Sequence, residues 1–155
     1  MIFKPEKIIS GGQTGADTGG LIAGQRLGIA TGGAAPKGYL TEEGARAEFL
    51  KGFGLIELPT KDLAERTREN IRNSDATLIF TDNPNSDGTA YTIRFCREMD
   101  KPYLIVDPRE DCCRKIRAFI DKNRPFVLNV AGNRESNSRG ITQRAIKIIQ
   151  QVFSG

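Results

Sequence analysis

The sequence predicts an α/β protein built on a doubly wound, mainly parallel sheet with helices on both faces. Three observations favour this class. Short apolar runs alternate with longer segments whose apolar residues recur at helical spacing, which is the pattern of βαβ units. A glycine-rich turn follows the first apolar run. The length of 155 residues suits one domain of this kind, so we assign residues 1–155 to a single ligand-binding domain.

Short segments with the apolar, β-branched composition of buried strands recur along the chain. The clearest is the continuous run Ala-Thr-Leu-Ile-Phe-Thr at residues 76–81, which is typical of a strand buried on both faces. In chain order, the predicted strands are residues 7–9, 29–33, 55–58, 76–81, 102–106 and 126–130.

Helices are predicted between most of these strands from the helical spacing of apolar residues. The first ends at Gly28, a plausible C-cap, and the second begins at Thr60, which can serve as its N-cap. Residues 34–44 are expected to form a loop rich in small residues. The predicted helices are residues 19–27, 60–74, 90–99, 109–123 and 140–153.

Residues 10–20 form the glycine-rich turn between the first strand and the first helix. Glycines let a backbone approach a phosphate, and a helix N-terminus presents free N–H groups to it. The spacing fits neither a Walker motif, because no lysine follows, nor the Gly-x-Gly-x-x-Gly fingerprint. We expect an anion-binding turn of another kind, although a tight turn that binds nothing is the alternative. The residues expected to bind are Gly11, Gly12, Gln13, Thr14 and Gly15.

Three more polar loops, residues 34–44, 82–89 and 131–138, also follow predicted strands. Because the carboxyl ends of parallel strands share one edge of a sheet, four loops should converge on one crevice. Further candidate ligand-binding residues, most of them in these loops, are Lys37, Asp82, Asn83, Gly88, Thr89, Asn129, Gly132, Arg134 and Ser136.

Several of these residues also have a structural interpretation. Lys37 suits a phosphate but could be a solvated surface lysine, and Arg134 could instead pair with an acid in its own or a neighbouring loop. Ser136 or Ser138 could cap the last helix. Arg66 and Asn70, four residues apart on the second helix, could face either solvent or the crevice.

The sequence contains no histidine, so acid–base chemistry would depend on other groups. Asp17, Glu42 and Glu135 are the weak catalytic candidates. Asp17 could equally cap the first helix, and no catalytic set is evident.

Composition argues against several classes of function. No apolar run is long enough to cross a membrane and no N-terminal segment suggests export, so we expect a cytoplasmic protein without membrane contact. The net charge of +4 is scattered and aromatics are few, which favours a small anionic ligand over nucleic acid. Cys96, Cys112 and Cys113 lack metal-site spacing, so we expect no metal site and reduced cysteines. A redox or metal role for the neighbouring Cys112 and Cys113 is the alternative, but no further ligand is close to them in the sequence. We also expect a homo-oligomer, because an exposed apolar helix face could form dimers or larger rings.

The chain resembles the putative molybdenum carrier family, whose fold is Rossmann-like and related to the SLOG superfamily of nucleotide-binding proteins. The resemblance extends over nearly the whole chain and its motifs occur in order. The matching segments are residues 10–17, 33–39, 66–70, 74–77, 87–89 and 128–136.

This resemblance implies binding of the molybdenum cofactor (molybdopterin), a pterin with a phosphate and an oxometal centre, or otherwise of a nucleotide. Phosphoribohydrolases of the superfamily carry Pro-Gly-Gly-x-Gly-Thr-x-x-Glu with a catalytic glutamate. Here Gly88 and Thr89 are kept, Thr92 replaces the glutamate, and the leading glycines are absent. The resemblance therefore favours a carrier; the alternatives are a nucleotide-processing hydrolase and a nucleotide sensor.

Overall fold

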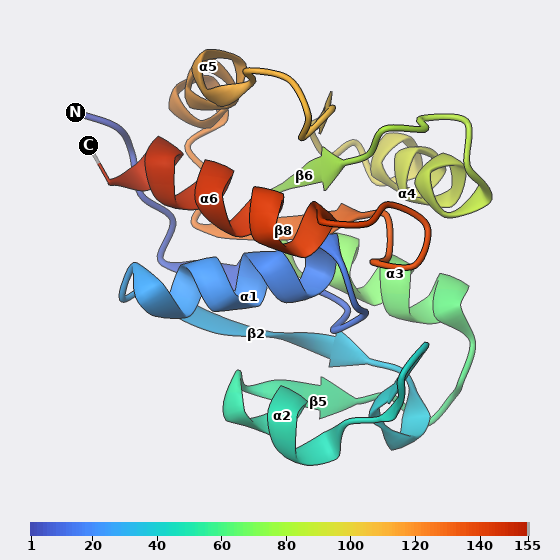
Figure 1. Cartoon of the computed structure of the whole chain (residues 1–155). Coiled ribbons are helices and arrows are strands. Elements are labelled where there is room, and N and C mark those ends of the chain that lie inside the picture. Colours follow the sequence, from blue (N-terminus) through green and yellow to red (C-terminus); the bar gives the residue numbers. More distant parts are fainter. Residues whose placement is uncertain (155) are drawn as a thin grey trace.

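The computed structural model describes residues 1–154, and its centre is a six-stranded parallel sheet (Figure 1). The strand order is β5-β2-β1-β8-β6-β7. Each predicted strand is confirmed within two residues at either end. The strands are β1 (Lys7–Ile9), β2 (Ala30–Ala35), β5 (Leu55–Glu57), β6 (Ala76–Phe80), β7 (Tyr103–Val106) and β8 (Val127–Gly132).

Helices cover both faces of the sheet, as the sequence predicts. One face carries α1 (Ala16–Arg26), α2 (Ala47–Gly52), α5 (Cys113–Asn123) and α6 (Ile141–Phe153). Figure 1 shows α1 and α6 lying side by side across it. The other face carries α3 (Leu63–Arg72) and α4 (Asp87–Glu98), which pack on each other through Ile71 and Phe95.

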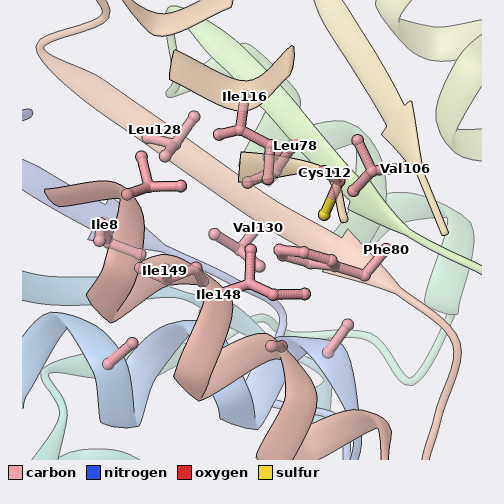
Figure 2. Packing of buried hydrophobic residues seen from close by; sticks show 14 of the residues in the cluster. Ile8, Leu78, Phe80, Val106, Cys112, Ile116, Leu128, Val130, Ile148 and Ile149 are labelled. Atoms are coloured by element: carbon pink, nitrogen blue, oxygen red, sulfur yellow. The ribbon is translucent and has the colours of Figure 1, made fainter. Parts of the chain in front are cut away.

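The main hydrophobic core lies between the central strands and the pair α5 and α6. Figure 2 shows Ile148 and Ile149 of α6 packing towards Val130 and Phe80 of the sheet. Phe80 and Val130 have no exposed surface. Burying a side chain of this size stabilises the fold by roughly 1.5–3 kcal/mol, so these contacts fix α6 and β8 firmly against each other.

Two glycines allow the ends of three strands to approach closely. Gly132 ends β8 with φ +151°, and a Cβ there would lie 2.0 Å from the backbone oxygen of Phe80. Gly15 precedes α1 with φ +82°, and its Cβ would lie 2.2 Å from the backbone oxygen of Asn133. Only glycine fits at both positions, so the turns after β1, β6 and β8 meet at one edge of the sheet.

Four helix starts differ from the prediction by three or four residues. Helix α1 begins at Ala16, which places Asp17 in its first turn. Helix α3 begins at Leu63 and is capped by Asp62, whose carboxylate accepts a 2.9 Å bond from the N–H of Ala64. The prediction that Thr60 is the N-cap is wrong. Its hydroxyl oxygen accepts from the N–H of Asp62, which is the N-cap itself and precedes the first residue of the helix.

The third of these starts matters most for the site. Helix α4 begins at Asp87, three residues before the prediction, so Gly88 and Thr89 belong to its first turn. In addition, α5 begins at Cys113 where the prediction began at residue 109.

The segment predicted as a loop at residues 34–44 contains ordered structure. It holds a 3₁₀ turn (Lys37–Tyr39) and a small antiparallel hairpin of β3 (Leu40–Thr41) and β4 (Gly44–Ala45). Helix α2 follows it. Two-residue strands and a six-residue helix are too short to show a periodic pattern, which is why the sequence did not indicate them. None of the helices in the described part of the chain is both long and apolar enough to span a bilayer.

Candidate functional site

A cavity of about 570 Å³ opens between α3 and α4 at the carboxyl edge of the sheet. Helix α1 leaves β1 on one face and α4 leaves β6 on the other, with β8 between them, so the cavity lies where the winding reverses. Four segments line it: the turn after β1, the N-terminal half of α3, the first turns of α4, and the end of β8 with its following loop.

The N-terminus of α4 points free backbone donors at this cavity. The first bond within the helix is donated by the N–H of Ala90 to the oxygen of Ser86, at 3.0 Å. The N–H groups of Asp87, Gly88 and Thr89 precede it and therefore have no carbonyl partner within the helix. Ser86 makes no side-chain cap; its hydroxyl donates to the Thr89 hydroxyl at 2.9 Å. These amides and the helix dipole form a site for an anion.

A buried ion pair forms the wall facing the glycine-rich turn. Nη1 of Arg66 lies 3.6 Å from Oδ2 of Asp17, and the two side chains are 14% and 8% exposed. The guanidinium fits over Gly11, where a Cβ would lie 2.4 Å from Cδ of Arg66. Burial raises the pKa of Asp17, and the nearby charge of Arg66 opposes this without overcoming it.

Asn129 lies on the cavity floor with one polar atom unpaired. It is 3% exposed, and its Nδ2 donates to the Thr77 hydroxyl at 3.3 Å. Its Oδ1 has no hydrogen-bond partner among the residues that the structure describes. Leaving a buried acceptor unpaired costs about 1–3 kcal/mol, so the atom requires an explanation.

The glycine-rich turn after β1 uses most of its amides within the protein. The N–H of Gly12 donates to Oγ of Ser10, that of Gln13 to Oδ2 of Asp17, and that of Thr14 to Oε1 of Gln13, at 3.3, 3.1 and 3.0 Å. In this arrangement these amides are not available to a ligand. The free donors of the site are instead at the start of α4.

The circularly permutated YpsA SLOG family matches residues 8–153, nearly the whole chain. The chain belongs to this family. Its structure is also similar to the crystal structure of a protein from Syntrophus aciditrophicus described as a putative molybdenum carrier. The two share 35% sequence identity and a TM-score of 0.90 over 100% of this chain and 98% of the other. No curated protein sequence matches significantly. The resemblance seen in the sequence is thereby confirmed.

In this SLOG chain, Glu42 joins the β3–β4 hairpin to the loops after β1 and β8. Its carboxylate accepts from the hydroxyls of Thr14 and Ser136 and, at 3.2 Å, from the N–H of Ser136. Nη1 of Arg134 lies 3.9 Å away. Burial would raise the pKa of Glu42, but the hydrogen bonds outweigh it and hold that pKa below its ordinary value. Glu42 therefore acts as a clamp outside the cavity lining.

Glu135 is held by the start of α6. Its carboxylate accepts from the N–H of Gly140, and from the N–H and hydroxyl of Thr142 at 3.2 and 2.8 Å. Burial opposes ionisation of Glu135, yet these donors lower its pKa. The N-cap residue of α6 is Gly140, and the side chain that accepts from the first turn of the helix is Glu135, where the sequence suggested a serine.

The structure brings some of the predicted ligand-binding residues together and separates others. Within the lining of the cavity are Gly11, Gln13, Gly88, Thr89, Asn129, Gly132 and Arg134. Outside that lining are Gly12, Thr14, Gly15, Lys37, Asp82, Asn83 and Ser136.

The residues outside the lining have contacts of their own. The side chain of Lys37 is exposed, and its backbone N–H donates to the backbone oxygen of Thr60 at 2.8 Å. Asp82 accepts from the Ser138 hydroxyl at 2.7 Å, and Oδ1 of Asn83 accepts from the N–H of Asn85 at 3.3 Å.

Sequence reasoning missed two exposed apolar residues of the cavity, Leu63 of α3 and Tyr91 of α4, which are 41% and 49% exposed. The spacing of Tyr91, three residues after Gly88, could have placed both on one helix face. Arg66 and Asn70, left open by the sequence, face the cavity.

Proposed function

We propose that this protein binds and carries a phosphate-bearing heterocyclic cofactor or nucleotide in the cavity between α3 and α4. The observation that carries the proposal is the set of free amides at the start of α4, which opens into a cavity at the switch point of the sheet. A volume of about 570 Å³ is within the usual range for small-molecule sites. Because the similar crystal structure is described as a putative molybdenum carrier, the molybdenum cofactor is the leading candidate.

The anionic group would bind at the mouth of the cavity. The amides of Gly88 and Thr89 would donate to its oxygens, together with the hydroxyl of Thr89. Arg134 would supply the positive charge: its side chain is 37% exposed, and its contact with Glu42, at 3.9 Å, is long for an ion pair. Arg66 is less available because Asp17 already neutralises it.

The residues present fit the organic part of such a cargo. Free amides and arginine suit the phosphate, and the apolar side chains of Leu63 and Tyr91 suit a flat ring. Within the described residues, no three His, Cys, Asp or Glu side chains cluster as metal ligands would. In this proposal the protein therefore recognises the phosphate and the ring.

Calorimetric titration with molybdopterin, molybdate, AMP, GMP and inorganic phosphate tests the proposal. Phosphate-bearing ligands should bind, and Thr89→Val and Arg134→Gln should each weaken binding about tenfold, the effect of one lost charge-assisted hydrogen bond. Arg139→Gln is the matched control, because Arg139 is exposed and lies outside the cavity. No heat from any ligand, or an equal loss in Arg139→Gln, would reject the proposal.

One observation favours a hydrolase as the second candidate. Asp17 lines the cavity and burial raises its pKa, which is a property of many catalytic acids. Against this, Thr92 occupies the place of the superfamily's glutamate, and its hydroxyl donates to the backbone oxygen of Gly88 at 3.0 Å. Release of free adenine from AMP, lost in Asp17→Asn, would establish the hydrolase; AMP that binds and stays intact would support carriage.

A further inference from the structure

We infer that Asn129 selects ligands whose ring carries an amino group that donates to the cavity floor. The site would then take an amino-bearing heterocycle joined to a phosphate, in preference to a bare sugar phosphate or an inorganic oxyanion. This inference rests on the proposed function and specifies which part of the ligand is read.

The first argument is the unpaired Oδ1 of Asn129, in contrast to a buried asparagine on the same cavity. Asn70 is 2% exposed and has every polar group paired: its Oδ1 accepts from the N–H of Ala34, and its Nδ2 donates to the oxygens of Ala34 and Arg66, at 2.8, 3.0 and 3.1 Å. The side-chain amide of Asn70, which joins α3 to β2, is therefore fully hydrogen-bonded. In contrast, the side-chain oxygen of Asn129 accepts no hydrogen bond from the residues that the structure describes.

The second argument is the distance between this acceptor and the anion donors. Asn129 precedes Gly132, the last residue of β8, by three positions, which places it about 10 Å below the edge of the sheet. The free amides of Gly88 and Thr89 are at that edge. A nucleoside monophosphate or a pterin phosphate is extended enough to reach both, whereas an inorganic oxyanion reaches only one.

The third argument is the character of the walls between these two points. Leu63 and Ala64 line one side, and Tyr91 and Thr92 line the other. The Tyr91 ring is fixed by stacking on Phe95, with centroids 6.2 Å apart and planes 24° from parallel. Apolar side walls with one acceptor at the floor match a flat ring that has a polar edge.

The test compares matched ligand pairs on wild type and Asn129→Leu. Each pair differs by one amino group: GMP against IMP, and AMP against purine riboside monophosphate. Ribose 5-phosphate reports the phosphate half alone. In at least one pair the amino-bearing ligand should bind about tenfold more tightly to wild type, and the leucine variant should abolish that difference. Ribose 5-phosphate should bind both proteins equally.

The control Asn123→Leu, at the end of α5, should retain the wild-type preference. Asn129→Leu removes an unpaired acceptor and one 3.3 Å bond to Thr77, so the variant should fold, and thermal unfolding checks this. If the nucleotides bind and neither pair shows a preference in wild type, or if the preference persists in Asn129→Leu, this inference is wrong. If no phosphate ligand binds wild type at all, the proposed function fails first.

Discussion

Replacing Arg66 with methionine should destabilise the protein at pH 7, and replacing Asp17 with asparagine as well should restore most of the loss. Arg66 and Asp17 lie 3.6 Å apart with little solvent contact. Removing one partner of a buried pair leaves an uncompensated charge, whereas removing both leaves none.

The expected size follows from the burial of the pair. Breaking such a pair costs about 3–5 kcal/mol, and the lower end applies because the cavity exposes 14% of the Arg66 side chain to solvent. For a domain of this length, a loss of about 3 kcal/mol lowers the melting temperature by roughly 6–12 °C. The double variant should lie within about 1 kcal/mol of wild type.

Urea unfolding at several pH values measures both effects. Burial already raises the pKa of Asp17, and it should rise further without Arg66. A carboxyl group that holds its proton more tightly when folded destabilises the fold as the pH increases, so the Arg66→Met deficit should be small near pH 4 and full at pH 7.

Arg72→Met is the matched control for this measurement, since its ion pair on the same helix is 52% and 33% exposed; it should change stability by less than about 1 kcal/mol. Equal losses of stability in the single and double variants would show that Arg66 does not stabilise the protein by neutralising Asp17.

Three further predictions concern Gly132, Glu42 and Cys112. Gly132→Ala should lower the free energy of unfolding in urea by about 3 kcal/mol or more, because Gly132 has a positive φ and an added Cβ would overlap the backbone of Phe80. Gly52→Ala is the control and should not lose stability, because the space around its Cβ is open. Equal losses in the two variants would contradict this close approach at Gly132. Glu42→Gln should lower the free energy of unfolding by about 1 kcal/mol at pH 7. Because the pKa of Glu42 is lowered in the folded protein, the stabilities of wild type and variant should converge as the pH falls through that pKa. A difference in stability that persists in acid would contradict stabilisation by the ionised carboxylate. Burial raises the pKa of Cys112 to about 11, so iodoacetamide at pH 8 should label the half-buried Cys113 first, as peptide mass spectrometry would show; labelling of Cys112 at the same rate would contradict its burial.

The strands and the edge of the sheet at which the cavity opens could be predicted from patterns along the sequence. Continuous apolar runs such as residues 76–81 mark buried strands, and the alternation of strands and helices places the polar loops at one edge. The start of α4 could not be predicted in the same way. Asp87, Gly88 and Thr89 have loop-like composition, yet first-turn residues need no intrahelical bond for their N–H groups.

The electrostatics of the cavity depend on contacts between residues far apart in the chain. Asp17 and Arg66 are separated by a whole βαβ unit, and no local pattern indicates that they meet. Similarly, the open acceptor of Asn129 is evident only once Thr77, on the adjacent strand, is seen to engage its other polar atom. The sequence also gave no sign that the amides after β1 would be used by neighbouring side chains.

An NMR titration of the ¹⁵N-labelled protein with inorganic phosphate can show whether the anion binds at the start of α4, because it reports on each amide separately. We expect the largest chemical-shift changes at Gly88 and Thr89, whose N–H groups precede the first bond within α4. The amides of Gly12, Gln13 and Thr14 should change little, since side chains already accept their protons. Dominant changes at that turn, or none at the start of α4, would show that the start of α4 is not the anion site.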